Sequence, residues 1–588
     1  MKLSDYVLDV LAQAGVTHVF EVCGGSLAHL LDSFYGRKDI STVSMHHEMA
    51  ASIAAEGYAR ASGRLGVAMA TSGPGATNMI TGIGSCFFDS IPCLFITGQV
   101  NTYEFKFDRP VRQKGFQETD IVSIVKPIAK DAFLVEEADK IKQLLCQAIQ
   151  IAGSDRPGPV LLDIPLNIQR ADIEPGTLRY CTINPLQPKS PDEKALNEVL
   201  EMIRSSSRPV ILAGGGVRIS NSQDLLLKFA QMTGIPLVTS LMGLDSFPHD
   251  DPLFAGMIGT YGNRYANLTV ANSDLILALG TRLDTRQTGT KPETFARGAK
   301  IVHVDIDPHE LNSNIKAHCL FNLDIGSFLL GMMKLMKSGI LADGGRLMPW
   351  KKMIMSYKTR YPSFRMPKSD AIDPNYFMHI LSEFLPDDAL VCVDVGQIQM
   401  WSAQTLDIHG TQRFLTQGGM ASMGSALPMA IGASFAKPDK VIVVITGDGG
   451  FQLNIQELQT VYHHNLPVKI ILINNRCYGM VRQFQEQYFD GRYQSTVIGY
   501  SNPDFRDVVS AYKIPAARIT RNDEISDTLA KLFDDRNPAF LEASINTDCK
   551  VMPKLSVNMP LEDQEPHLHR DELRSNMFIE LLPVPGGL

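Results

Sequence analysis

The segment VIVVITGDGGFQLNIQELQTVYHHNLPVKIILINN, residues 441–475, constrains the fold of this chain more than any other. An apolar β-branched run leads through GDGG at 447–450 into a helical pattern near 454–462, and a second apolar run ends in two asparagines. This order predicts a strand, a crossover helix and a second, parallel strand. Because such crossovers are right-handed, the two strand ends lie side by side, so we expect Asp448 and Asn475 to meet at one edge of a sheet.

The polar residues of this segment suit one kind of ligand. Asp448 and Asn475 offer a carboxylate and an amide oxygen, hard ligands with which proteins bind Mg²⁺ while water and phosphate fill the other positions. The glycines at 447, 449 and 450 let the backbone approach a diphosphate closely. A GDG triplet alone also describes an ordinary turn, but its spacing to the paired asparagines favours a site for a metal-bridged diphosphate.

Strand and helix patterns alternate in three stretches of the chain. Strand patterns include VTHVF in the first stretch, RPVILAGGG in the second and DALVCVDVG in the third. Such alternation predicts mostly parallel sheets with helices on both faces, and 588 residues are too many for a single core. We therefore expect an α/β fold of three doubly wound domains at 1–185, 186–355 and 356–555, followed by an irregular tail at 556–588 that covers the surface or acts as a lid.

Composition excludes several classes of partner. The net charge of -8 argues against nucleic acid or an anionic membrane as a partner held by bulk electrostatics. The nine cysteines are scattered without CxxC spacing, which indicates neither a disulfide framework nor a zinc site and fits a reducing cytoplasm best. The first residues, MKLSDYVLDVLAQAG, form an amphipathic helix pattern rather than a secretory signal, and no apolar run is long enough to span a membrane.

A candidate catalytic carboxyl group lies in the first stretch. Glu48, in MHHEMAASIAAEGYAR, stands where a strand pattern ends and a helix pattern begins. A glutamate at a helix start is commonly a residue that complements the helix dipole. In a protein that also binds a metal-bridged diphosphate, the same position is where a functional carboxyl group of a parallel sheet is expected.

These motifs together resemble those of the thiamine diphosphate dependent acetohydroxyacid (acetolactate) synthase family, over most of the chain. The resemblance covers HHEMAASIAAEGYARASG, ATSGPGATN, GFQETDIV and DRPGPVLLDIP, and then TGIPLVTSLMGLDSFP and SDLILALGTRLDTRQTG in the second stretch. It implies thiamine diphosphate and Mg²⁺ as cofactors and FAD as a structural one. It also implies a homodimer, or a tetramer of paired dimers, with active sites at the subunit interface.

The resemblance assigns roles to individual residues. Glu48 activates the cofactor, while Gln117 and Gly25 position substrates beside Phe116 and Phe484. Asp448, Asn475 and the backbone carbonyl of Cys477 bind the metal. Thiamine diphosphate contacts are implied for Gln397, Gln399, Ala421, Met423, Gly447, Gly449, Gly450 and Met480, and flavin contacts for Arg156, Gly214, Gly215, Arg282, Asp284 and Arg286.

Departures from the family pattern gather where substrates enter. Phe484 stands at the position of a tryptophan that selects larger 2-oxo acid acceptors, and other departures are Cys23, Leu166, Thr260, Tyr261 and Ile398. The chain is therefore expected to decarboxylate pyruvate or a similar 2-oxo acid and to transfer the acyl carbanion to a second carbonyl compound. That acceptor is either a 2-oxo acid, giving acetolactate, or a ketone or 4-keto nucleotide sugar, giving a tertiary alcohol as in the yersiniose-type branch.

Two alternative functional hypotheses are based on the same residues. Plain decarboxylation to an aldehyde is suggested by the adjacent His46 and His47, although the HHE context also matches the synthases. A catalytically silent scaffold should have lost the activating carboxyl group or a metal ligand, whereas Glu48, Asp448 and Asn475 are all present. The carboligase interpretation accounts for more of the sequence than either.

Overall fold

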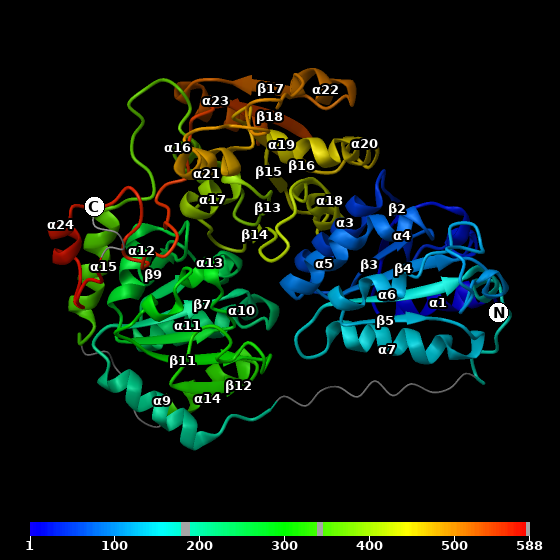
Figure 1. Ribbon diagram of the computed structural model, residues 1–588, viewed down its shortest axis with the longest axis horizontal. Helices are drawn as coiled ribbons and strands as arrows, with labels where there is room; N and C mark the ends of the chain where they lie inside the picture. Colours follow the sequence, from blue (N-terminus) through cyan, green and yellow to red (C-terminus); the bar gives the residue numbers. More distant parts are fainter. Residues whose placement is uncertain (178–188, 338–344, 584–588) are drawn as a thin grey trace.

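The computed structural model describes residues 1–177, 189–337 and 345–583, which form three α/β domains (Figure 1). Each domain is built around a six-stranded sheet in which every paired strand is parallel. Buried apolar runs such as Val468–Asn474 form the central strands, as expected for sheets covered on both faces. The predicted fold class is confirmed.

The first domain has the strand order β2-β1-β3-β4-β6-β5. Its strands are β1 (His18–Val22), β2 (Ser41–Ser44), β3 (Gly66–Ala70), β4 (Cys93–Gln99), β5 (Asp131–Leu134) and β6 (Pro159–Pro165). The main helices are α1 (Leu3–Gln13), α3 (Glu48–Ser62), α5 (Ile80–Asp89) and α7 (Ile141–Gly153). Helix α3 begins at Glu48, and His47 caps it by accepting a hydrogen bond from the Met49 amide.

The middle domain has the order β12-β11-β10-β7-β8-β9. Its strands are β7 (Pro209–Ala213), β8 (Leu237–Thr239), β9 (Phe254–Met257), β10 (Leu275–Leu279), β11 (Lys300–Asp305) and β12 (Cys319–Asn322). Its helices include α9 (Glu193–Ser205), α10 (Gly215–Ile219), α11 (Gln223–Thr233), α12 (Arg264–Asn272), α14 (Ile325–Lys337) and α15 (Met348–Arg360).

The third domain has the order β14-β13-β15-β16-β18-β17. Its strands are β13 (Leu390–Val393), β14 (Arg413–Leu415), β15 (Ile442–Gly447), β16 (Val468–Asn474), β17 (Ala516–Ile519) and β18 (Ala539–Ser544). Its helices include α16 (Pro374–Phe384), α17 (Gln397–Thr405), α18 (Ala426–Ala436), α20 (Leu458–His463), α21 (Gly479–Tyr488), α22 (Phe505–Ala511) and α23 (Ile525–Leu532). The predicted neighbouring strands β15 and β16 pair in parallel, with Gly447 opposite Ile473.

The helix expected near 454–462 is shorter than predicted. A 3₁₀ segment occupies Gln452–Glu457, and regular helix α20 begins only at Leu458. Asn454 leaves helical geometry with φ of -133° because its side-chain amide donates to the Gly424 carbonyl at 2.7 Å. A tertiary contact therefore overrides the helical pattern of the sequence.

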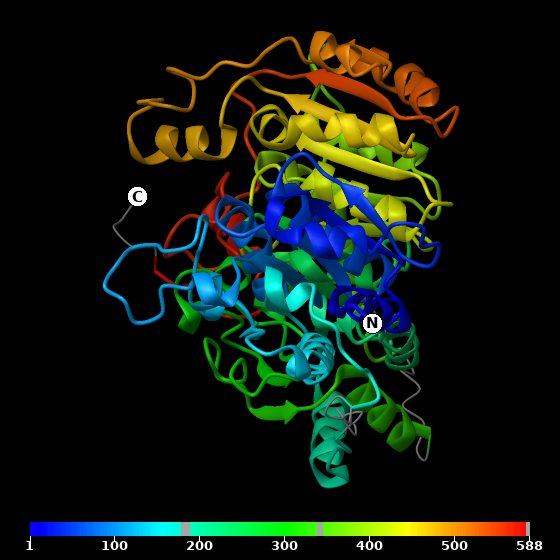
Figure 2. The ribbon, with the colours of Figure 1, turned by 90° about the vertical axis from the view of Figure 1, so that its right-hand side faces the viewer.

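Helices α3 and α18 join the first and third domains in one hydrophobic core. Their backbones approach so closely that a Cβ atom on Gly57 would lie 2.2 Å from the Met429 carbonyl oxygen, and one on Gly432 would lie 1.8 Å from that of Ala54. Seen from the side of the first domain, the third domain lies above it (Figure 2).

The tail after the third domain returns to the middle domain. Leu555, Leu561 and Leu573 are buried in a core that also contains Trp350 and Tyr357 of α15, and the tail includes helix α24 (Arg570–Ser575). The predicted domain boundary near 185 lies outside the described residues, and the one near 355 falls within α15. The described residues include no helix long and apolar enough to cross a lipid bilayer.

Candidate active site

The carboxyl ends of β15 and β16 bring together the residues predicted to bind a metal. Asp448 follows β15 and is buried; its Oδ2 accepts hydrogen bonds from the Tyr500 hydroxyl at 2.8 Å and the Asn502 amide at 3.3 Å. Asn475 follows β16; its amide nitrogen donates to Gln397 Oε1 at 3.0 Å and its Oδ1 accepts from the Cys477 amide at 3.2 Å. An amide oxygen has a second lone pair, so Oδ1 retains capacity for a cation.

The electrostatics of this edge favour a bound cation. Burial raises the pKa of Asp448 to about 6, against the opposing hydrogen bond from Tyr500. A divalent ion would stabilise the ionised form of this carboxylate. Among the described residues no group of three or more His, Cys, Asp or Glu could hold a metal ion alone. A metal here would therefore take further ligands from phosphate and water, as Mg²⁺ does.

Residues 416–424, here called the cofactor loop, connect β14 to α18 beside this edge. Ala421 has φ of 55°, a left-handed conformation that turns the backbone. A Cβ atom on Gly449 would lie 3.4 Å from the Met423 methyl and 2.5 Å from the Tyr478 ring, while one on Gly447 would meet no atom within 4 Å. Gly449 is thus packed closely against side chains, whereas Gly447 borders open space.

Two buried groups beside the cofactor loop bear on cofactor binding. The Ser425 hydroxyl is buried without a hydrogen-bond partner in the structure. Asp394, at the end of β13, accepts from the Gly424 amide at 2.9 Å and from Thr446 at 2.7 Å, which anchors the loop to the sheet. The open backbone at Gly447, the unsatisfied hydroxyl and the oxygen ligands fit a metal-bound diphosphate.

The two glutamines predicted to contact thiamine diphosphate, Gln397 and Gln399, have different surroundings. The Gln397 amide nitrogen donates to Gln483 Oε1 and to the Cys549 carbonyl, while its oxygen holds Asn475. Gln399 instead donates to Thr416 and to the Gln417 carbonyl, so its amide supports the cofactor loop. Met480 is partly buried against the core of the third domain.

The first domain forms a second cluster around Glu48. Asn78 donates to Glu48 Oε2 at 2.9 Å. Gln117 has φ of 64° and packs against Gly73: a Cβ atom on that glycine would lie 3.0 Å from the Gln117 Cβ. Gly25 borders open space, in a loop that Ser26 and Thr71 tie to the same strand ends at 2.7 Å. The predicted catalytic residues therefore lie on neighbouring loops.

The Glu48 cluster and the Asp448 cluster are separate within one chain. Among the described residues, no hydrogen bond or ion pair joins Glu48, Gln117 or Gly25 to Asp448, to Asn475 or to the cofactor loop. The two predicted substrate residues belong to different clusters: Phe116 is 85% exposed in the first domain, and Phe484 is 45% exposed in the third, where it packs with Tyr488 and Phe489.

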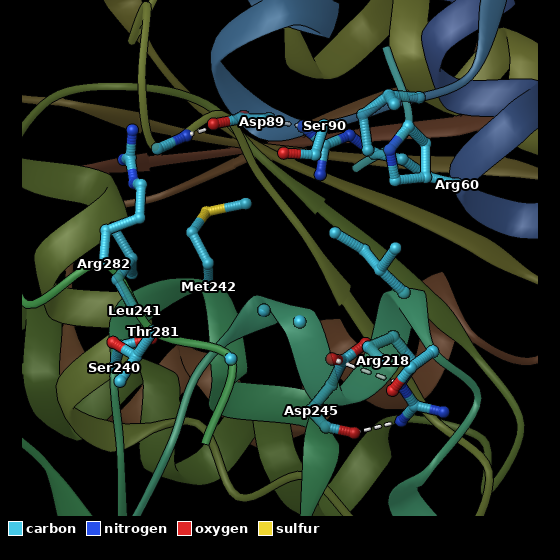
Figure 3. Close-up of a pocket in the computed structure, with 18 of the residues that line it drawn as sticks. Arg60, Asp89, Ser90, Arg218, Ser240, Leu241, Met242, Asp245, Thr281 and Arg282 are labelled. Carbon is cyan, nitrogen blue, oxygen red and sulfur yellow. Dashed lines mark hydrogen bonds and ion pairs between the residues drawn. The ribbon is translucent and has the colours of Figure 1, made fainter. Parts of the chain in front are cut away.

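A cavity of about 790 Å³ opens between the three domains. Figure 3 shows Arg60, Asp89 and Ser90 on one side, and Arg218 and Asp245 on the other. Five of the six predicted flavin residues line it: Arg156, Gly215, Arg282, Asp284 and Arg286. Gly214 does not line it but permits close packing, because a Cβ atom there would lie 2.1 Å from the Gly280 carbonyl oxygen.

Comparison with known proteins decides the family. Models of the N-terminal thiamine pyrophosphate binding domain, the central domain and the C-terminal thiamine pyrophosphate binding domain of thiamine pyrophosphate enzymes match residues 1–124, 196–332 and 394–543. Acetolactate synthase 2, chloroplastic, of Nicotiana tabacum is 38% identical over 567 residues, covering 94% of this chain and 83% of that protein. Acetolactate synthase 1, chloroplastic, of Zea mays is 36% identical over 563 residues, covering 94% and 87%. The chain belongs to the acetolactate synthase family.

As a member of this family the protein is a thiamine pyrophosphate dependent enzyme, and the resemblance inferred from its motifs is confirmed. Sequence reasoning missed the polar residues that surround the predicted ones. Asp394 and Asn78 stand at strand or helix ends, a signal that could have found them. Tyr500, Arg60 and Arg413 carry no such signal, because only the tertiary fold brings them to the site.

Proposed function

We propose that this protein decarboxylates pyruvate or a similar 2-oxo acid and joins the resulting acyl unit to a second carbonyl compound, giving acetolactate when donor and acceptor are both pyruvate. The observation that carries the proposal is the pair of clusters: a buried carboxylate and amide beside the cofactor loop, and a glutamate held by Asn78 at the start of α3. Thiamine diphosphate, when bound, supplies the electron sink for decarboxylation.

Residues of the chain would bind the metal, support the cofactor, exchange a proton and orient the substrates. Asp448, the Asn475 amide oxygen and the Cys477 carbonyl would hold Mg²⁺, and Met423 would support the cofactor from the cofactor loop. Because Asn78 donates to Glu48 Oε2, Oε1 is the oxygen available to exchange a proton with the aminopyrimidine ring. Gln117 and Gly25 would orient the substrates.

The separation of the two clusters supports a homodimer in which each active site takes one cluster from each subunit. This arrangement can be tested by mixing two inactive variants, Glu48→Gln and Asp448→Asn. In a mixed dimer one site carries both substitutions and the other carries neither, so random mixing should restore about a quarter of the wild-type activity. If both clusters of a site came from one chain, mixing would restore none. Pairing of dimers into tetramers would be read from the sedimentation of the wild-type protein.

FAD is the proposed occupant of the three-domain cavity. The cavity is dinucleotide-sized, its lining carries three predicted arginines, and the buried Nε of Arg218, which lies 3.5 Å from Asp245 Oδ1, has no hydrogen-bond partner among the described residues. The flavin would be structural, and neither acyl transfer nor decarboxylation requires its redox chemistry. Visible flavin absorbance in the purified protein, or its return when FAD is added to stripped protein, would support this assignment.

The acceptor decides between two versions of the reaction. Acetolactate formation is favoured by the family. A ketone or 4-keto nucleotide sugar acceptor is favoured by Phe484, whose ring leaves more room than a tryptophan and lies half-exposed in an aromatic cluster. The deciding experiment is mass-spectrometric product analysis with thiamine diphosphate, Mg²⁺ and pyruvate, with and without added ketones.

Each product has one meaning in that experiment. Dominant acetolactate supports the synthase, tertiary-alcohol adducts support the ketone-accepting version, and acetaldehyde alone would replace both with plain decarboxylation. No turnover at all would contradict the proposal. We also place the enzyme in the cytoplasm, where cysteine thiols stay reduced.

A further inference from the structure

The cofactor loop is held by a residue of another domain. Asp89, the last residue of α5, accepts a hydrogen bond from the Gly418 amide at 3.0 Å through Oδ2 and from the Gly419 amide at 2.8 Å through Oδ1. Its side chain is 1% exposed. Because a buried carboxylate makes strong, charge-assisted hydrogen bonds to amides, Asp89 fixes the start of the loop that carries Ala421 and Met423.

A second set of contacts fixes the same loop from α3. Arg60 contacts Asp89 Oδ2 and Glu56 Oε1, both at 2.7 Å. Glu56 Oε2 accepts from the Gln417 amide nitrogen at 2.9 Å, and Gln417 Oε1 accepts from the Ser422 amide at 3.1 Å. The contacts from Arg60 therefore reach both ends of the segment 417–422.

Charge balance makes these contacts depend on one another. The two buried carboxylates of Glu56 and Asp89 face one guanidinium, so the amide donors of the loop must compensate the second negative charge. Moving the loop away would leave that charge buried and unsatisfied, which is costly. The same helix α3 begins at Glu48, so one rigid element connects the network to the candidate catalytic carboxyl group.

The network also forms part of the wall of the three-domain cavity. Arg60 and Asp89 line it (Figure 3), and so does Gly418. Arg413, another lining residue, donates to the Arg60 carbonyl at 3.3 Å and forms an ion pair with Asp245 of the middle domain at 2.5 Å. A ligand in the cavity would thus lie against Arg60 and Asp89, the same residues that hold the cofactor loop.

We propose that Arg60 and Asp89 are positioning residues that couple occupation of the cavity to thiamine diphosphate binding at the cofactor loop. The inference rests on the proposed function, since it takes FAD as the occupant of the cavity. An occupant that orders Arg60 favours the loop conformation that supports Met423, and binding of the two cofactors becomes mutually favourable. Linkage requires that each cofactor then tighten the other by the same factor.

The experiment measures this factor without turnover. Thiamine diphosphate is titrated, with Mg²⁺ and without pyruvate, into FAD-free and FAD-saturated protein by calorimetry. We expect FAD to lower the thiamine diphosphate Kd of the wild type by about tenfold or more, and Asp89→Asn to reduce this effect to about twofold or less while FAD still binds. The matched control is Asp163→Asn, which alters a buried first-domain carboxylate that binds Thr97 and Gln99 instead.

The outcomes are decisive in either direction. Equal coupling in the wild type and in Asp89→Asn, no coupling in the wild type, loss of coupling in Asp163→Asn, or failure of the wild type to bind FAD would each overturn the inference. If Asp89→Asn does not fold, Gln417→Leu interrupts the other set of contacts and decides by the same measurement. The product assay with pyruvate tests the proposed function separately, so the two can fail independently.

Discussion

Replacing Gly432 by alanine should separate the first and third domains at their closest contact. Gly432 lies on α18, and the added methyl carbon would stand 1.8 Å from the Ala54 carbonyl oxygen of α3. Non-bonded carbon and oxygen atoms need about 3.5 Å, so the two helices must move apart by more than about 1 Å. The contact is backbone, which leaves no side chain to rotate out of the way.

The expected magnitude follows from opposing terms. Overpacking of this kind costs about 1–3 kcal/mol or more, and the better helix propensity of alanine returns about 1 kcal/mol. For a rigid backbone contact the cost is taken at its upper end, about 3 kcal/mol, which leaves a net loss of about 2 kcal/mol. This corresponds to a fall in Tm of roughly 4–8 °C for a domain of this size. Because α3 starts at Glu48, a shift of about 1 Å should also lower kcat/KM by about 100-fold.

The assay combines a thermal scan with steady-state kinetics on acetolactate formation. The control is Gly153→Ala at the end of α7, where an added Cβ meets no atom within 4 Å. That variant should have the same free energy of unfolding as the wild type or one higher by about 0.4–1 kcal/mol. Its Tm should therefore be equal or slightly higher. If Gly432→Ala kept both the Tm and the activity of the wild type, the close helix contact would not position Glu48 and the reasoning would be refuted.

Three further predictions concern single carboxyl groups. Glu48→Gln should lower turnover by about 10²–10⁴-fold while thiamine diphosphate still binds in calorimetry; undiminished turnover would remove Glu48 from the mechanism. Asp448→Asn should weaken Mg²⁺ activation by about 100-fold or more, and an unchanged Mg²⁺ titration would show that Asp448 does not bind the metal. Burial raises the pKa of Glu457 to about 7 from its ordinary 4.5. Between these two pH values the folded protein keeps a proton that the unfolded chain loses. The contribution of Glu457 to the free energy of unfolding therefore falls as pH rises from about 4.5 to about 7. Glu457→Gln should therefore gain Tm relative to the wild type between pH 5 and 8, and parallel Tm profiles would contradict the assigned pKa.

The local environment of Glu457 shows why this effect belongs to the folded state. Its side chain is fully buried, with one oxygen accepting from the His46 amide at 3.0 Å and the other from Thr460 at 2.8 Å. The His46 contact joins residues 411 positions apart, so it disappears on unfolding. In Glu457→Gln the amide oxygen can still accept from His46, which separates the effect of charge from that of the hydrogen bond.

Much of the site was predictable because it depends on short-range patterns. The spacing from Asp448 to Asn475 implied adjacent parallel strands, since a right-handed crossover allows little else, and β15 and β16 pair as expected. The position of Glu48 between strand and helix patterns likewise predicted its place at the start of α3. Asn454 was misjudged, because its hydrogen bond to Gly424 comes from a loop that no local pattern reveals.

The sequence by itself determined the fold class, the family and the placement of Asp448 and Asn475 at neighbouring strand ends, because periodicity and motif spacing are properties of neighbouring residues. Only the tertiary structure decided how the domains meet. The hydrogen bonds that the Gly418 and Gly419 amides donate to Asp89 join residues more than half of the chain apart, and the arginines of the cavity come from all three domains. Such contacts depend on packing between elements distant in sequence, where burial makes each polar group require a partner that no local pattern specifies.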